Sequence, residues 1–184
     1  MPTTDIMIDL ETLGTTPDSV IVSIAAVKFD PFEDYQERGV TSDQLPTLNI
    51  LVDIDSQTDR RVDDNTVTWW SQQDPLVQET VFSPIGRVSF ADALDQLHRF
   101  IWNTGGRVWA QGTQFDIAML EHAYRSVNRA YPWQYSQARD SRTLLDLVAV
   151  NLPKATHDAV ADCWRQIIGV QQALATLGIQ RFVR

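Results

Sequence analysis

Two carboxylate side chains, Asp9 and Glu11, lie two residues apart at the end of the first apolar segment of the chain. Residues 5–11 alternate in a way that predicts a β-strand, which breaks before Gly14. Side chains two positions apart on a strand point to the same face, so both carboxylates would project together. For an isolated pair of this kind a solvated strand end is the more frequent explanation, and the pair gains meaning only with the residues that follow.

A third carboxylate and a histidine–aspartate pair occur later in the chain. Asp116 falls in the first turn of a predicted helix, where an acidic residue also gains about 0.3–1 kcal/mol from the helix dipole. His157 and Asp162 are separated by about 500° of helical rotation, so one continuous helix would not turn both to one side. A loop position for His157 and a helical one for Asp162 would let them face each other. A capping histidine beside a solvated aspartate is the alternative.

Four carboxylates brought together would form a metal site. At about 4 Å each pair would repel by roughly 4 kcal/mol at an effective dielectric of about 20, so the cluster must take up protons or bind cations. Oxygen ligands favour Mg²⁺ or Mn²⁺ over Zn²⁺. Two such cations roughly 3.5–4 Å apart are the usual arrangement for hydrolysing a phosphodiester, with a histidine to take the proton of the attacking water. The expected metal ligands are Asp9, Glu11, Asp116 and Asp162, and the expected base is His157.

The elements around these residues predict a layered α/β domain. Strands are expected at residues 5–11, 20–29, 48–54 and 107–112. Helices are expected over residues 90–104, 115–127 and 144–150, with a helical pattern from Asp63 onward and a final helix between an N-cap at Thr156 and Gly178. Strands first and then alternating helices and strands indicate one mixed sheet covered by helices, in a single domain over residues 1–184.

The composition suits a single globular core, with 184 residues, 43% of them hydrophobic and 21% charged. No apolar run reaches the roughly 20 residues of a membrane span, and the N-terminus does not look like a signal peptide. Cys163 is the single cysteine, so a reducing compartment is expected. These observations favour a cytoplasmic protein without membrane contact.

The net charge of −9 argues against a basic face that grips duplex DNA. Two divalent cations would add four positive charges where the phosphate binds. We therefore expect a short footprint at the end of a nucleic-acid chain.

The three acidic motifs together resemble those of the DEDDh exonucleases, a family named for four acidic ligands and a histidine. The resemblance rests on Asp9-Leu10-Glu11, on Phe115-Asp116 and on residues 157–162. A narrower likeness, to the T-even phage exodeoxyribonuclease A group and to bacterial exoribonucleases of the AS type, rests on residues 8–14, 66–70, 139–143 and 157–163. It extends from residue 5 to about residue 177. Many DEDDh members have an asparagine shortly before the second motif, where this chain has Gly112-Thr113-Gln114.

The resemblance implies a ribonuclease H-like fold, with a mixed five- or six-stranded sheet and helices on both faces, and removal of nucleotides from a 3′ end. It assigns Asp9, Glu11 and Asp162 to a first metal ion. Asp9 would bridge to a second ion supported by Asp116, and His157 would be the general base. The backbone at Thr12 and Leu13 would contact the terminal nucleotide, with Leu13 as a wedge near the last base.

Further residues are candidates for substrate contacts. Trp69 and Trp70 are adjacent in a predicted helix, so they point about 100° apart and cannot both be core. One of them could stack on a base, which is worth about 1–3 kcal/mol, and the sequence leaves open which one. Arg142 could reach a phosphate or pair with Asp140 or Asp146. The remaining tryptophans, Trp102, Trp109, Trp133 and Trp164, are expected in the core.

Three functions are compatible with these motifs. The first is a Mg²⁺- or Mn²⁺-dependent 3′-to-5′ exonuclease on single-stranded nucleic acid, with DNA favoured over RNA by the phage-type likeness. The second is an exoribonuclease that trims short RNAs or RNA tails. The third is a nucleic-acid-binding module without catalysis, against which the full set of acidic residues argues. Oligomeric state stays open, since small DEDDh enzymes are often homodimers, and a phage-encoded protein would work in the host cytoplasm.

Overall fold

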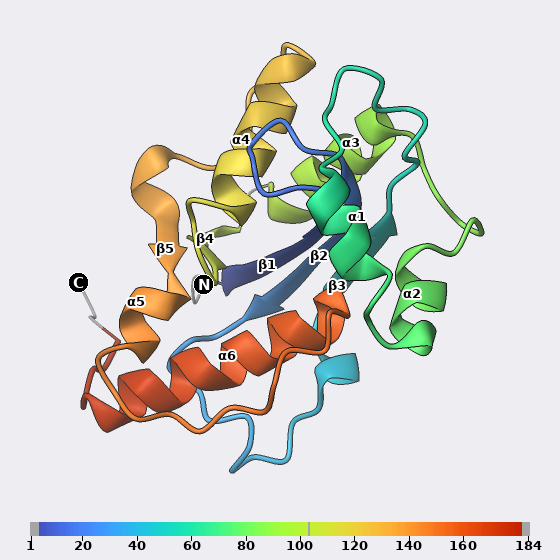
Figure 1. The fold of residues 1–184 in the computed structure, drawn as a ribbon. Coiled ribbons are helices and arrows are strands. Elements are labelled where there is room, and N and C mark those ends of the chain that lie inside the picture. The colour runs from blue at the N-terminus through green and yellow to red at the C-terminus, as the bar shows by residue number, and fades with distance from the viewer. Residues whose placement is uncertain (1–3, 103, 182–184) are drawn as a thin grey trace.

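The computed structural model describes residues 4–102 and 104–181, which fold around one mixed β-sheet (Figure 1). Its five strands are β1 (Thr4–Thr12), β2 (Ile21–Phe29), β3 (Thr47–Leu51), β4 (Gly105–Ala110) and β5 (Ala138–Asp140), in the order β3-β2-β1-β4-β5. The first three strands are antiparallel neighbours, whereas β4 runs parallel to β1 and β5 parallel to β4. The sheet therefore matches the predicted mixed arrangement, and β1 lies at its centre.

Helices cover both faces of this sheet. On one face α3 (Phe90–Ile101) and α4 (Asp116–Ser126) pack on the even-numbered side chains of β1, Ile6, Ile8 and Leu10. On the other face α6 (Ala159–Thr176) packs on Met7 and on apolar residues of β2. The two sides of the sheet are thus distinguished by the period-2 alternation of β1. Figure 1 shows α6, in orange to red, on the opposite side of the sheet from α3 and α4.

Three smaller helices complete the fold, and the first two of them contribute to a third apolar cluster beside the end of β1. They are α1 (Asp64–Trp70), α2 (Pro75–Val81) and α5 (Ser141–Leu145), with single 3₁₀ turns at Ser42–Gln44 and Tyr135–Gln137. Trp70 and Val81 pack there against Leu13, Val20 and Val22. This cluster fastens α1 and α2 to the strand that carries Asp9 and Glu11.

The contact between α6 and the sheet is close. Cys163 has no exposed surface, and its thiol lies 3.7 Å from the carbonyl oxygen of Met7 and 3.8 Å from that of Ala25. A larger side chain would not fit between the helix and the two central strands, so the cysteine serves as a small packing residue.

Some local expectations were wrong. Asp158, not Thr156, caps α6, because its carboxylate accepts a hydrogen bond of 2.8 Å from the Ala161 amide. The helix expected over residues 144–150 instead spans Ser141–Leu145, because Asp140 accepts from the Thr143 amide and starts it earlier. The strand expected over residues 107–112 begins earlier, at Gly105, and β5 was not foreseen.

Of the four tryptophans expected in the core, Trp109 and Trp133 are buried and Trp164 is partly buried. Trp102 is 65% exposed at the end of α3, where it stacks on His98. Within the described residues, no helix is both long and apolar enough to cross a membrane.

Candidate active site

The first two carboxylates lie where β1 ends. Asp9 and Glu11 share the face of Met7, which is the face that α6 covers. The pairing of β1 with β2 shifts between Glu11 and Thr12, so that the register passes over Val22. Such an irregularity is typical of a strand that re-aims a side chain beside a functional site. Glu11 is buried, whereas Asp9 keeps part of its surface open.

Asp116 reaches the same strand from the opposite layer. It begins α4, and its Oδ1 accepts a hydrogen bond of 3.1 Å from the backbone amide of Leu10, midway between Asp9 and Glu11 in sequence. The carboxylate is buried. The parallel arrangement of β1 and β4 brings the start of α4 to the edge of the sheet where β1 also ends.

Asp162 and His157 approach from the start of α6. Asp162 lies in the first turn, and its two oxygens accept hydrogen bonds from the backbone amides of Thr156 (3.0 Å) and His157 (2.9 Å). The loop is thereby folded back over the helix, and His157 takes a left-handed backbone conformation with φ of 58°. Ligand atoms of Glu11, His157 and Asp162 all lie within 4.8 Å of one another. His157 is in the loop and Asp162 in the helix, as the sequence predicted.

Gln166 completes the carboxylate cluster and was missed from the sequence. It lies one turn after Asp162 on the same face of α6, and its Nε2 donates a hydrogen bond of 2.7 Å to Oδ1 of Asp9. Its Oε1 is buried without a hydrogen-bond partner in the described structure. The spacing of four residues from Asp162 was the signal that could have identified it.

Burial and mutual repulsion raise the proton affinity of the cluster. Desolvation, and then the charges of Asp116, Glu11 and Asp162, raise the pKa of Asp9 well above its usual range. Desolvation and the charges of Asp162, Asp116 and Asp158 raise the pKa of Glu11 to about 8. Desolvation raises the pKa of Asp116 to about 7. Burial is the largest cause of all three shifts; the charge of Arg142 opposes it at Asp116, whereas Asp9 and Glu11 lack a compensating positive charge.

A divalent cation would supply that charge. The ion pairs formed by residues 4–102 and 104–181 include none of the four carboxylates. The donor set is almost entirely oxygen, which suits Mg²⁺ or Mn²⁺. The unpartnered Oε1 of Gln166 beside Asp9 also marks a polar position where a ligand can be met. The residues therefore fit a divalent metal centre.

The two tryptophans of α1 have different environments, which the sequence could not assign. Trp70 is 3% exposed, and its Nε1 donates a hydrogen bond of 2.9 Å to the carbonyl oxygen of Thr12. Trp69 is 39% exposed, and the centre of its ring lies 4.8 Å from that of His157, edge to face. Trp70 therefore holds the end of β1, and Trp69 is the one available to a substrate base.

These residues line one cavity of about 600 Å³. All four carboxylates, His157 and Gln166 line it, from β1, α4, α6 and the loop before α6. Thr15, Asn65, Thr66 and Trp69 line it from the side of α1. Arg165 of α6 also lines it and was not singled out from the sequence. The cavity is large enough for a nucleotide-sized ligand.

Two of the expected substrate contacts are not placed in this cavity. The Leu13 side chain is buried with Val20 and Val22 instead of forming a wedge, and its amide donates to the carbonyl oxygen of Val20. Arg142 is exposed outside the lining, where it donates to the carbonyl oxygen of Gln111, and it pairs with neither Asp140 nor Asp146. Thr12 does line the cavity, although Trp70 already binds its carbonyl oxygen.

The fold is that of ribonuclease H-like exonucleases. The structure of Escherichia coli exonuclease I with a dT13 oligonucleotide is similar, with a TM-score of 0.65 and 14% sequence identity over 96% of this chain. A zinc-bound form of an E. coli exonuclease I complex with single-stranded DNA has a TM-score of 0.67 and 14% identity over 97% of this chain. The chain spans 42% of the length of each of these proteins.

Sequence similarity gives the family. An exodeoxyribonuclease of enterobacteria phage T4 is 26% identical in an alignment of 206 positions that covers 92% of this chain and 88% of the phage protein. Residues 4–174 match the family model of the 3′-5′ exoribonuclease Rv2179c-like domain, and the chain belongs to this family. The predicted relationship to 3′-to-5′ exonucleases is thereby confirmed.

Proposed function

We propose that this protein is a divalent-metal-dependent exonuclease that removes nucleoside monophosphates one at a time from the 3′ end of single-stranded nucleic acid. The observation that carries the proposal is the convergence of Asp9, Glu11, Asp116, Asp162 and His157 on one cavity. They come from β1, α4, α6 and the loop before α6. Buried like charges gathered without a cation partner are costly to fold, which indicates that they are kept for binding.

The four carboxylates would hold the metal, with Asp9, Glu11 and Asp162 around one ion and Asp9 and Asp116 toward a second. Mg²⁺ or Mn²⁺ there would offset the charge of the scissile phosphate and make water a better nucleophile. Asp9 is aligned for this role by Gln166, and Asp116 by the Leu10 amide.

His157 would be the general base, because it is the histidine that faces the carboxylates. A ring nitrogen of its imidazole takes the proton from the attacking water, and the leaving 3′-oxygen is protonated in turn. Asp162 fixes the backbone of His157, and the edge of the Trp69 ring supports its imidazole. The histidine is therefore oriented before substrate arrives.

Trp69 would stack on a base near the 3′ end, because base–aromatic stacking binds a single strand without sequence preference and Trp69 is 39% exposed. DNA is the substrate we propose first, because the 26%-identical phage relative is an exodeoxyribonuclease over nearly the same length. RNA is the second candidate, favoured by the description of the family as exoribonucleases.

The test uses 5′-labelled single-stranded DNA and RNA of one sequence, with Mg²⁺, with Mn²⁺ and with EDTA. A ladder that shortens from the 3′ end and disappears in EDTA is expected, and the faster ladder names the preferred sugar. His157→Ala should slow cleavage by roughly 100- to 10,000-fold with little change in Mn²⁺ affinity. An equal loss of Mn²⁺ affinity would make His157 a ligand instead of a base. Intact substrate under every condition would contradict the proposal.

A further inference from the structure

Arg165 is a basic residue in the wall of an acidic cavity. It lies three residues after Asp162 on α6, so the two side chains are neighbours about one helical turn apart. Its Nε donates a hydrogen bond of 2.6 Å to the carbonyl oxygen of Pro153, and its Nη1 donates one of 3.0 Å to Oε1 of Gln111. These two bonds hold the guanidinium at the cavity wall, and within the described residues no protein group accepts a hydrogen bond from its Nη2.

The charges around Arg165 give it a distinct role. Among the described residues that line the cavity it is the single lysine or arginine, whereas five lining residues are acidic, Asp9, Glu11, Asp63, Asp116 and Asp162. The ion pairs of residues 4–102 and 104–181 do not include Arg165 either. An arginine held in place by neutral acceptors, with no carboxylate bound to its fork, is free to bind an incoming anion.

The direction of cleavage indicates which anion Arg165 could bind. An exonuclease that works from the 3′ end cleaves the last linkage, so the scissile phosphate lies at the carboxylate cluster. The terminal nucleoside carries no phosphate on its 3′ side. Any second phosphate within the cavity must therefore belong to the linkage on the 5′ side of the scissile one.

On the basis of the function proposed above, we propose that Arg165 binds the phosphate of this penultimate linkage and so sets the register of the strand. Metal ions held by the carboxylates would bind the scissile phosphate. The Arg165 guanidinium, about one turn further along α6, would bind the phosphate of the penultimate linkage. This arrangement gives a protein with a net charge of −9 a fixed positive contact for the strand that does not depend on a basic surface.

A purely structural role is the competing explanation, because Arg165 also links α6 to Pro153 and to Gln111. In that case its removal would disturb the cavity for every substrate alike. A contact with the penultimate phosphate, in contrast, matters only to substrates that carry this phosphate. Substrate length can therefore separate the two roles.

The experiment measures kcat/KM for release of the 3′ nucleotide from three substrates with Mg²⁺ or Mn²⁺. They are a dinucleotide with a 5′-hydroxyl, the same dinucleotide with a 5′-phosphate, and a trinucleotide with a 5′-hydroxyl. Arg165→Ala should lower kcat/KM by roughly 10- to 100-fold on the trinucleotide, the size of a lost charge-assisted hydrogen bond. The 5′-phosphorylated dinucleotide should lose as much, because its phosphate occupies the same place. The 5′-hydroxyl dinucleotide should be cleaved as by the wild type.

Arg107→Ala is the matched control, since Arg107 is exposed on β4 and outside the cavity lining, and it should change none of the three rates. Arg165→Gln, whose amide can still donate to Pro153 or Gln111, serves if the alanine variant does not fold, and the same pattern is expected. Equal losses on all three substrates, or none on the trinucleotide, would overturn the assignment. Wild-type protein that cleaves none of them would overturn the proposed function, and the inference with it.

Discussion

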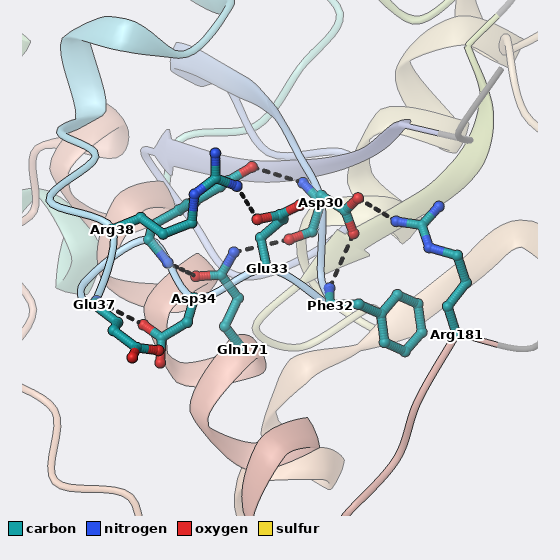
Figure 2. Close-up of polar contacts among 9 residues, drawn as sticks. Asp30, Phe32, Glu33, Asp34, Glu37, Arg38, Gln171 and Arg181 are labelled. Atoms are coloured by element: carbon teal, nitrogen blue, oxygen red, sulfur yellow. Dashed lines mark hydrogen bonds and ion pairs between the residues drawn. The ribbon is translucent and has the colours of Figure 1, made fainter.

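The two halves of α6 place glutamines in contrasting surroundings. In the C-terminal half, Gln171 uses both ends of its amide: Nε2 donates to the carbonyl oxygen of Asp30 (2.8 Å), and Oε1 accepts from the amide of Tyr35 (3.3 Å). The Asp30 carboxylate pairs with Arg181 and accepts from the amide of Phe32 (Figure 2). The carbonyl oxygen and carboxylate of Asp30 and both ends of the Gln171 amide thus have partners within the protein.

In the N-terminal half, Gln166 is as deeply buried as Gln171 but uses only one end of its amide. The pKa values of the carboxylates Asp9, Glu11 and Asp116 are raised chiefly by burial, and at Asp9 and Glu11 the charges of neighbouring carboxylates add to the rise. Within the described residues, the Gln171 amide therefore has both ends hydrogen-bonded, whereas the Gln166 amide leaves its Oε1 unpaired beside Asp9. A buried polar atom without a partner lowers the stability of the fold, and such atoms are expected mainly at functional sites.

The largest test of this contrast is Glu11→Gln, which keeps the size of the side chain and removes its charge. Cleavage should fall on the order of 1,000-fold, since a lost metal ligand costs several kcal/mol in the transition state. The same variant should be more stable than the wild type in EDTA at pH 8, because a buried, repelled carboxylate is gone. Activity assays and urea unfolding measure the two effects. A variant that is fully active and no more stable than the wild type would show that Glu11 is neither a metal ligand nor a destabilising buried charge.

Metal removal should expose a pH dependence of the same origin. The pKa of Glu11 is raised in the folded protein to about 8 from 4.5, so the folded state binds this proton more tightly than the unfolded chain. The corresponding stability is fully present below pH 4.5 and is lost as pH rises through about 8, at about 1.4 kcal/mol per pKa unit.

In EDTA the free energy of unfolding should therefore be lower at pH 8.5 than at pH 5, and excess Mn²⁺ should restore it at the higher pH. Asp9 and Asp116 act with the same sign, and Glu11→Gln is the control that should flatten part of the slope. Denaturant titrations at both pH values are the measurement. Equal values in EDTA would mean that the carboxylates are not strained by their burial.

The smallest effects come from exchanging each glutamine for leucine. Gln171→Leu should lower the free energy of unfolding by about 1–3 kcal/mol, because two backbone groups lose buried partners, and should leave kcat unchanged. Gln166→Leu should leave stability nearly unchanged and lower activity by roughly tenfold, because Asp9 loses its alignment. We therefore expect Gln171→Leu to change stability without activity, and Gln166→Leu to change activity with little effect on stability. Similar losses in both properties for both variants would show that the halves do not differ.

Much of the site was within reach of the sequence, because its ligands belong to short local motifs. The alternation of β1 predicted a common face for Asp9 and Glu11, and helical rotation separated His157 from Asp162, both as found. The family resemblance then supplied Asp116, which no local pattern connects to β1. These predictions depended on periodicity, which a packed sheet and helix preserve.

Other features depended on tertiary contacts that no periodicity encodes. Leu13 follows the motif but packs in the apolar cluster under α1, so the expected wedge is absent. Thr156 and Asp158 are both acceptable N-caps, and the hydrogen bond from the Thr156 amide to Asp162 decides between them. Arg165 and Gln166 acquire meaning only when α6 crosses the end of β1.

Cys163 gives the molecule a built-in indicator of local opening. Its thiol is sealed between α6 and the two central strands, and burial raises its pKa well above the usual range, so neither reagent nor hydroxide reaches it in the closed protein. A thiol reagent can label it only when α6 lifts from the sheet. Because the neighbouring Asp162 is a proposed metal ligand, the labelling rate would report how often the centre comes apart, and how far a bound cation slows that fluctuation.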